Sequence, residues 1–128
     1  MTWQAAGLVA LGGAIGSVLR WAVVLLAAHR IGAGFPWGTL AVNLAGSFAI
    51  GLVAELAAGG SLPPQARIFL ATGVLGGFTT FSAFSLETLL LTRDGLPLSA
   101  LGYAVGSVVL GLGAAYLGTV LARALAHG

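Results

Sequence analysis

The sequence contains no cysteine and no lysine, and only 6% of its 128 residues are charged. A soluble domain usually carries about 25% charged residues, so this chain cannot cover a water-facing surface. Without cysteine it can form no disulfide, thiol nucleophile or cysteine metal site. The five basic residues are arginines, too sparse for a nucleic-acid-binding patch. These absences indicate a protein of the lipid bilayer that binds no nucleic acid.

Hydrophobic residues make up 59% of the chain, and a spanning helix needs a stretch of roughly 20 predominantly apolar residues. Four segments reach that length, at approximately residues 3–28, 37–58, 68–91 and 98–121. Glycine, proline and charged residues separate them. The short connections leave no room for a soluble domain. The sequence therefore predicts an all-α integral membrane protein, with one four-helix transmembrane domain over residues 1–128 and both termini on the same side.

The positive charges that flank the spans are evenly divided. Arg67 and Arg123 lie on the side of the termini, and Arg30 and Arg93 lie on the other. Because arginine and lysine bias normally sets orientation, a tie favours dual topology, in which the chain inserts both ways. The alternative is that two charges per side are too few to interpret. If both orientations exist, an antiparallel homodimer is the natural assembly.

Glycines spaced four apart allow transmembrane helices to approach closely. Three such pairs lie within the predicted spans, Gly12 and Gly16, Gly73 and Gly77, and Gly102 and Gly106. With 21 glycines in the chain, some pairs fall at this spacing by chance. They fit packing within one protomer and contacts between two protomers equally well.

The third span contains the stretch GGFTTFSAFS, residues 76–85, which is rich in poor helix formers. A broken helix is tolerated in lipid only where protein or trapped water satisfies its backbone, and transporters use such breaks to bind ions. We therefore expect the third helix to be broken mid-membrane. The simpler alternative is that the glycines permit close packing and each hydroxyl bonds to the carbonyl one turn back.

Phe78, Phe81 and Phe84 lie three apart and are expected to share a face. The partly positive edge of an aromatic ring can face a small anion, although such stripes are usually packing residues. No histidine–acid–hydroxyl set and no metal-ligand spacing occurs, so we expect no enzyme.

Five further polar residues interrupt the apolar spans. Asn43 either joins helices or donates to a passing anion. Arg20 either has a function inside the membrane or extends to its surface. Glu87 could pair with an arginine or line an entrance, and Tyr103 and Ser107 could form a hydroxyl-bearing track on one helix face.

Three blocks of sequence resemble the fluoride channels of the CrcB/Fluc family. They are GGAIGSVLRW (Gly12–Trp21), GTLAVNLAGSFAIG (Gly38–Gly51) and GVLGGFTTFSAFSLET (Gly73–Thr88). The resemblance covers essentially the whole chain. It implies a multi-pass protein of the inner (plasma) membrane that exports cytoplasmic fluoride passively and gives fluoride resistance. It also implies an antiparallel, dual-topology homodimer with two pathways, each lined by both subunits.

The resemblance also implies roles for individual residues. It assigns the fluoride pathway to Asn43, Thr80, Phe81, Ser82, Phe84, Glu87, Tyr103 and Ser107. Arg20 matches an arginine near the aqueous vestibule, and the carbonyls of Gly76 and Thr79 match those that hold a structural sodium ion between the subunits. One departure concerns the fourth span, where relatives continue the hydroxyl track but this chain carries Gly111 and Ala115 before Thr119.

Two other functions remain open on the sequence. A small multidrug-type, proton-coupled antiporter also has four spans and dual topology, but it needs a carboxylate in the first span. The only charge there is Arg20. The other alternative is a membrane scaffold that transports nothing.

Overall fold

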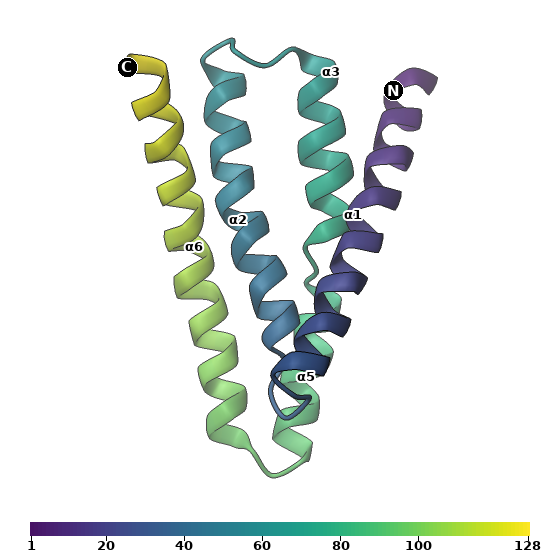
Figure 1. Ribbon diagram of the computed structural model, residues 1–128, viewed down its shortest axis with the longest axis vertical. Helices are drawn as coiled ribbons and strands as arrows, with labels where there is room; N and C mark the ends of the chain where they lie inside the picture. The colour runs from purple at the N-terminus through teal and green to yellow at the C-terminus, as the bar shows by residue number, and fades with distance from the viewer.

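The computed structural model describes all 128 residues, and its regular elements are all helices. In chain order they are α1 (Trp3–Arg30), α2 (Trp37–Ala58), α3 (Pro64–Arg67), the π-helix η1 (Ile68–Leu75), α4 (Gly76–Phe78), α5 (Ser82–Arg93) and α6 (Pro97–His127). The segments α3, η1, α4 and α5 follow one another in the chain and together make up the third long unit of the molecule, the third unit (Figure 1). Four units are long and apolar enough to cross a membrane, which confirms that prediction.

A side-chain cap and glycine turns define the ends of the helices. The Thr2 hydroxyl caps α1 by accepting the Ala5 N–H at 3.1 Å. Each of the three connections turns at a glycine with positive φ, Gly32 at 110°, Gly60 at 76° and Gly95 at 78°. The third and fourth units extend beyond the predicted spans, to residues 64–93 and 97–127. Hydropathy marks the apolar stretch, whereas the helical hydrogen bonds continue through the polar residues at its ends.

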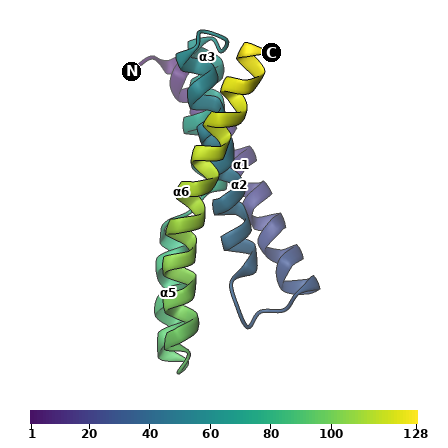
Figure 2. The same cartoon turned by 90° about the vertical axis from the view of Figure 1, so that its left-hand side faces the viewer.

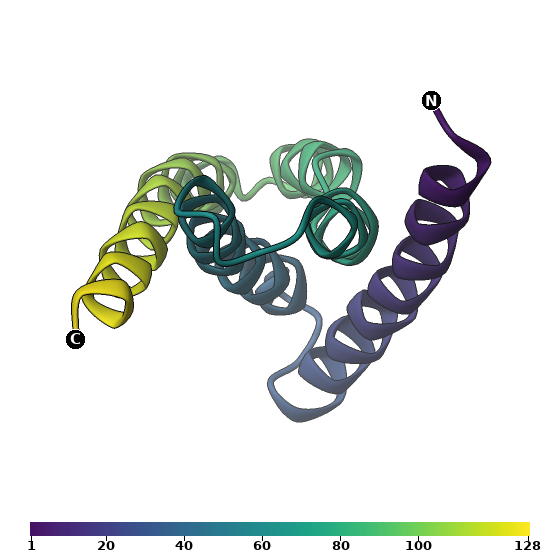
Figure 3. The ribbon, with the colours of Figure 1, turned by 90° about the horizontal axis from the view of Figure 1, so that it is seen from above.

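Both termini and the α2–α3 connection lie at one end of the molecule, and the α1–α2 and α5–α6 connections lie at the other (Figure 1). Seen from above, α1 and α6 lie on opposite sides, with α2 and the third unit between them (Figure 3). The C-terminal end of α1 and the N-terminal end of α2 diverge from α5 (Figure 2). Because α2 and α6 pack together and run in the same direction, residues on them can be compared level by level.

Close packing between the helices depends on glycine. A Cβ added to Gly16 would lie 2.0 Å from the carbonyl oxygen of Val74, and one on Gly77 would lie 2.5 Å from that of Gly13. Similar contacts join Gly51 of α2 to the backbone of α6. Gly12, Gly16, Gly73 and Gly77 therefore pack within the protomer, whereas Gly102 and Gly106 have nothing within 4 Å.

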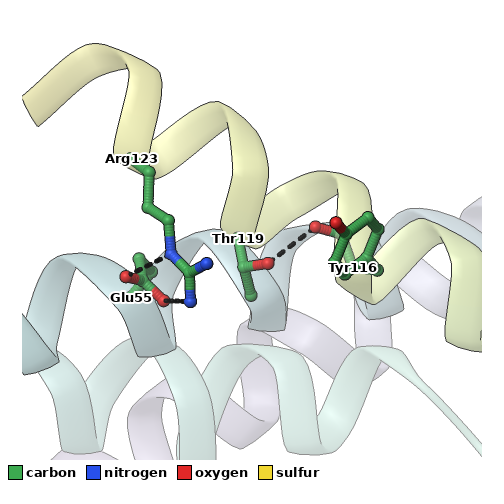
Figure 4. Close-up of polar contacts among 4 residues, drawn as sticks. All are labelled: Glu55, Tyr116, Thr119 and Arg123. Atoms are coloured by element: carbon green, nitrogen blue, oxygen red, sulfur yellow. Dashed lines mark hydrogen bonds and ion pairs between the residues drawn. The ribbon is translucent and has the colours of Figure 1, made fainter. Parts of the chain in front are cut away.

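An ion pair also joins α2 to α6. Arg123 Nε lies 2.8 Å from Glu55 Oε1 and its Nη2 lies 3.3 Å from Oε2, while Thr119 bonds within its own helix to the Tyr116 carbonyl (Figure 4). Because 61% of the Arg123 side chain is exposed, solvent screens the pair and it contributes little to stability. Packing of small residues, rather than charge, holds these two helices together.

The outer surface is apolar. Only 15 of the 128 residues are buried, and large aliphatic and aromatic side chains are exposed along all four units. A surface of this kind is stable against lipid or against a second copy, but not in water.

Candidate functional site

The third unit loses its helical form between α4 and α5 (Figure 1). Thr79 has extended backbone, with φ −83° and ψ 160°. In a continuous helix the Thr80 N–H would donate to the Gly76 carbonyl, and the Ala83 N–H would donate to the Thr79 carbonyl. Here the first donates to Asn43 Oδ1 at 2.8 Å and the second to Thr80 Oγ1 at 3.1 Å. The carbonyls of Gly76 and Thr79 therefore lose their helical donors.

Asn43 satisfies both backbone groups of Thr80. Its Oδ1 accepts the Thr80 N–H at 2.8 Å, and its Nδ2 donates to the Thr80 carbonyl at 3.0 Å. The amide thus joins α2 to the non-helical segment. This agrees with the interpretation of Asn43 as a residue that joins helices. An amide nitrogen has two N–H groups, and the second makes no hydrogen bond in the protein, so Asn43 can also donate to a ligand.

A cavity of about 380 Å³ lies between α2, the third unit and α6. Its lining includes Asn43, Ser47, Gly76, Thr79, Thr80, Phe81, Phe84 and Ser107. The Ser107 Oγ is buried and has no hydrogen-bond partner. Most of the remaining lining is apolar, which is the usual composition of a site that binds a small ligand through a few placed polar groups.

The two cavity phenylalanines differ in exposure. Phe81 is 79% exposed in the protomer. Its ring centroid lies 5.7 Å from that of Phe84, and the Phe84 ring packs in an edge arrangement against Tyr103 at 5.2 Å. Phe78 does not line the cavity that Phe81 and Phe84 line. The non-helical residues between α4 and α5 separate it from them.

Glu87 pairs with two hydroxyls and with no arginine. Thr39 Oγ1 donates to its Oε1 and the Tyr103 hydroxyl donates to its Oε2, both at 2.7 Å. Thr39 and Tyr103 are buried, with 2% and 1% exposure. Glu87 and Asp94 also line a second cavity, of about 410 Å³, between α1, α2 and α5. The carboxylate therefore lies at the wall of this second cavity.

Arg20 reaches the non-helical segment from α1. Its Nη1 lies 3.5 Å from the Thr79 carbonyl oxygen, which is a long hydrogen bond. The guanidinium is thus directed toward the interior of the molecule and the third unit, although it lines neither cavity.

The hydroxyls of the third unit fall into two groups. Thr79, Ser85 and Thr88 donate to the carbonyl four residues back, as the simpler interpretation predicts. Thr80 does not, because its Oγ1 accepts the Ala83 N–H and lies 3.3 Å from Ser82 Oγ. Thr80 therefore caps the first turn of α5.

The sequence interpretation missed two polar residues of the site. Thr39 binds Glu87, and Ser47 lines the first cavity. Thr39, Asn43 and Ser47 are spaced four apart on α2, so they lie on one face of an otherwise apolar helix. That polar stripe is the signal that could have found them.

Comparison with known proteins places these residues in a family. Residues 7–119 match the family described as CrcB-like protein, Camphor Resistance (CrcB). The chain belongs to the CrcB family. The matched range includes every residue of the two cavities and of the non-helical segment. Together with four apolar helices, CrcB membership shows a multi-pass membrane protein.

The chain is similar to several proteins named fluoride-specific ion channel FluC. One from Thermus thermophilus is 57% identical over 118 residues, which cover 92% of this chain and 94% of that protein. One from Hyphomonas neptunium is 56% identical over 119 residues, covering 91% and 93%. One from Rhizobium meliloti is 52% identical over 121 residues, covering 92% and 95%.

Proposed function

We propose that this CrcB protein is a fluoride-selective channel of the plasma membrane and gives fluoride resistance. The supporting observation is a cavity where the free Asn43 N–H, the unpaired Ser107 hydroxyl and the Phe81 and Phe84 rings meet. The named relatives are 52–57% identical to the chain over the aligned residues. Export is passive and not enzymatic, because an inside-negative potential supplies about 2.3 kcal/mol per 100 mV for each anion.

The lining of the cavity suits a small, strongly hydrated anion. Such an ion enters a low-dielectric site only when donors replace its water. An amide N–H and a hydroxyl supply hydrogen bonds, and ring edges supply partial positive charge without a competing cation. Tyr103, Glu87, Thr80 and Ser82 extend this polar lining toward the second cavity and the α5 cap. Arg20 lies near it and serves the aqueous vestibule.

The pathway is completed by a second, antiparallel copy of the chain. Phe81 is 79% exposed and the cavity is open in one protomer, so a partner is needed to enclose the anion. The even division of arginines between the two ends supports insertion in both orientations. Each dimer then contains two fluoride pathways, and the interrupted third unit lies mid-membrane at its centre.

A structural sodium ion at the dimer axis fits the backbone of this segment. The carbonyls of Gly76 and Thr79 have lost their helical donors, and unwound carbonyls are the groups that coordinate sodium in transporters. The long 3.5 Å contact from Arg20 to the Thr79 oxygen is weak enough for a cation to displace. No group of three histidines or carboxylates offers another metal site. Sodium should stay bound, so fluoride efflux that carries stoichiometric sodium tracer out of sealed liposomes would contradict this role.

The function is tested by fluoride efflux from liposomes that contain the purified protein. We expect wild type to release fluoride but not chloride. Phe81→Ile and Phe84→Ile should each reduce fluoride release strongly, because an aliphatic side chain of similar size lacks a positive edge. Phe78→Ile is the matched control, since Phe78 lies outside the cavity and should conduct like wild type.

Elution of each variant as a dimer on size exclusion shows that it is folded. Absence of fluoride release from wild type refutes the channel. Release that requires a proton gradient supports the antiporter instead. If both cavity variants conduct like wild type, the phenylalanines only pack and the pathway lies elsewhere.

A further inference from the structure

Two stripes of residues, polar at every position except Gly111, run side by side on α2 and α6. Each has three positions spaced four apart, Thr39, Asn43 and Ser47 on α2, and Tyr103, Ser107 and Gly111 on α6. Residues at this spacing lie on one helix face. Since the two helices pack together and run in the same direction, the stripes form three successive levels.

The lower two levels are each completed by both helices. At the first, Thr39 and Tyr103 bind the two oxygens of Glu87. At the second, Asn43 and Ser107 line the same cavity.

At the third level only α2 carries a hydroxyl. A Cβ added to Gly111 would lie 3.6 Å from Ser47 Oγ, so the two residues face each other in ordinary contact. The absence of a side chain at Gly111 leaves Ser47 Oγ uncovered on that side, within the lining of the cavity.

The Ser47 hydroxyl makes no hydrogen bond within the protein. Serine in a helix commonly donates to the carbonyl four residues back, as Ser85 does at 2.9 Å. The neighbouring Ser107 hydroxyl is also without a partner, although its oxygen is fully buried. Two unpaired hydroxyls in one cavity indicate a ligand that accepts hydrogen bonds from both.

We propose that Ser47 is an anion-binding residue of the pathway, and that its hydroxyl takes the place of the one that α6 lacks at Gly111. The ligand is a small, hydrogen-bond-accepting anion, and the assignment rests on the proposed fluoride channel. After Asn43 and Ser107, Ser47 gives the anion its next donor along the cavity. The pathway thus continues on α2 where α6 carries no hydroxyl.

The test is fluoride efflux from liposomes with four proteins. Ser47→Ala should conduct roughly ten-fold more slowly than wild type, the effect of losing one hydrogen bond to a charged group. Adding Gly111→Ser to Ser47→Ala should restore most of the flux, because a side chain at Gly111 fits and returns a hydroxyl to the same level. The matched control is Ser17→Ala, which removes an exposed hydroxyl of α1 outside both cavities.

The outcomes separate this proposal from the channel itself. If wild type releases no fluoride, the proposed function fails and this inference fails with it. If wild type conducts and Ser47→Ala matches it, the channel stands and the role of Ser47 is refuted. A slow Ser47→Ala that elutes as wild type but is not restored by Gly111→Ser also refutes it, because the loss is then one of packing.

Discussion

Replacing Asn43 by alanine should destabilise the protein as well as slow the channel. The change removes the bonds of 2.8 and 3.0 Å that satisfy the N–H and the carbonyl of Thr80. Leaving a buried polar group unpaired costs about 1–3 kcal/mol, so two groups give about 2–6 kcal/mol. Because both bonds are only partly buried and one side faces an open cavity, we expect about 2–4 kcal/mol.

The loss is measured by unfolding the purified protein with sodium dodecyl sulfate and following helix content by circular dichroism. Thr92→Ala is the control, since it removes one exposed side-chain bond to a helical carbonyl and should change stability by less than about 0.5 kcal/mol. Fluoride efflux is measured on the same preparations. An Asn43→Ala protein that unfolds with the control refutes the structural role, even if its flux is reduced.

Two further changes test packing and insertion. Gly16→Ala places a Cβ 2.0 Å from the Val74 carbonyl and should cost about 1–3 kcal/mol or more in the same unfolding assay, whereas Gly102→Ala meets nothing within 4 Å and should not destabilise the chain. Removing Arg30 and Arg93, while the arginines at the other end remain, should direct most copies to insert with cytoplasmic termini. Reporter fusions at the C-terminus measure this, and a single orientation already present in wild type would contradict dual topology.

The sequence predicts the helical architecture well because hydropathy is summed over about 20 residues. Trp37 and Ala58, the predicted limits of the second span, are also the limits of α2. The π-helix η1 has no such signal, since its residues form an ordinary apolar run. Its backbone lies against Gly12 and Gly16 of α1, and contacts of that kind depend on tertiary structure.

The candidate site is predictable only in part. Weak helix formers in residues 76–85 indicate where regular helix ends, but they do not say what replaces its hydrogen bonds. Asn43 lies 37 residues from Thr80 in sequence, and only the packing of α2 on the third unit brings them together. The sequence does not indicate the proposed role of Ser47 for a similar reason, because that role depends on the absence of a side chain at Gly111.

The position of Asn43 connects the two ion sites that we propose. By accepting the Thr80 N–H, its amide prevents the bond that would otherwise occupy the Gly76 carbonyl. That carbonyl is then free for a cation at the dimer axis. The remaining N–H of the same amide is available to an anion in the cavity that Asn43 lines. A side chain with only one polar atom could not perform both tasks, since holding Thr80 already requires a donor and an acceptor.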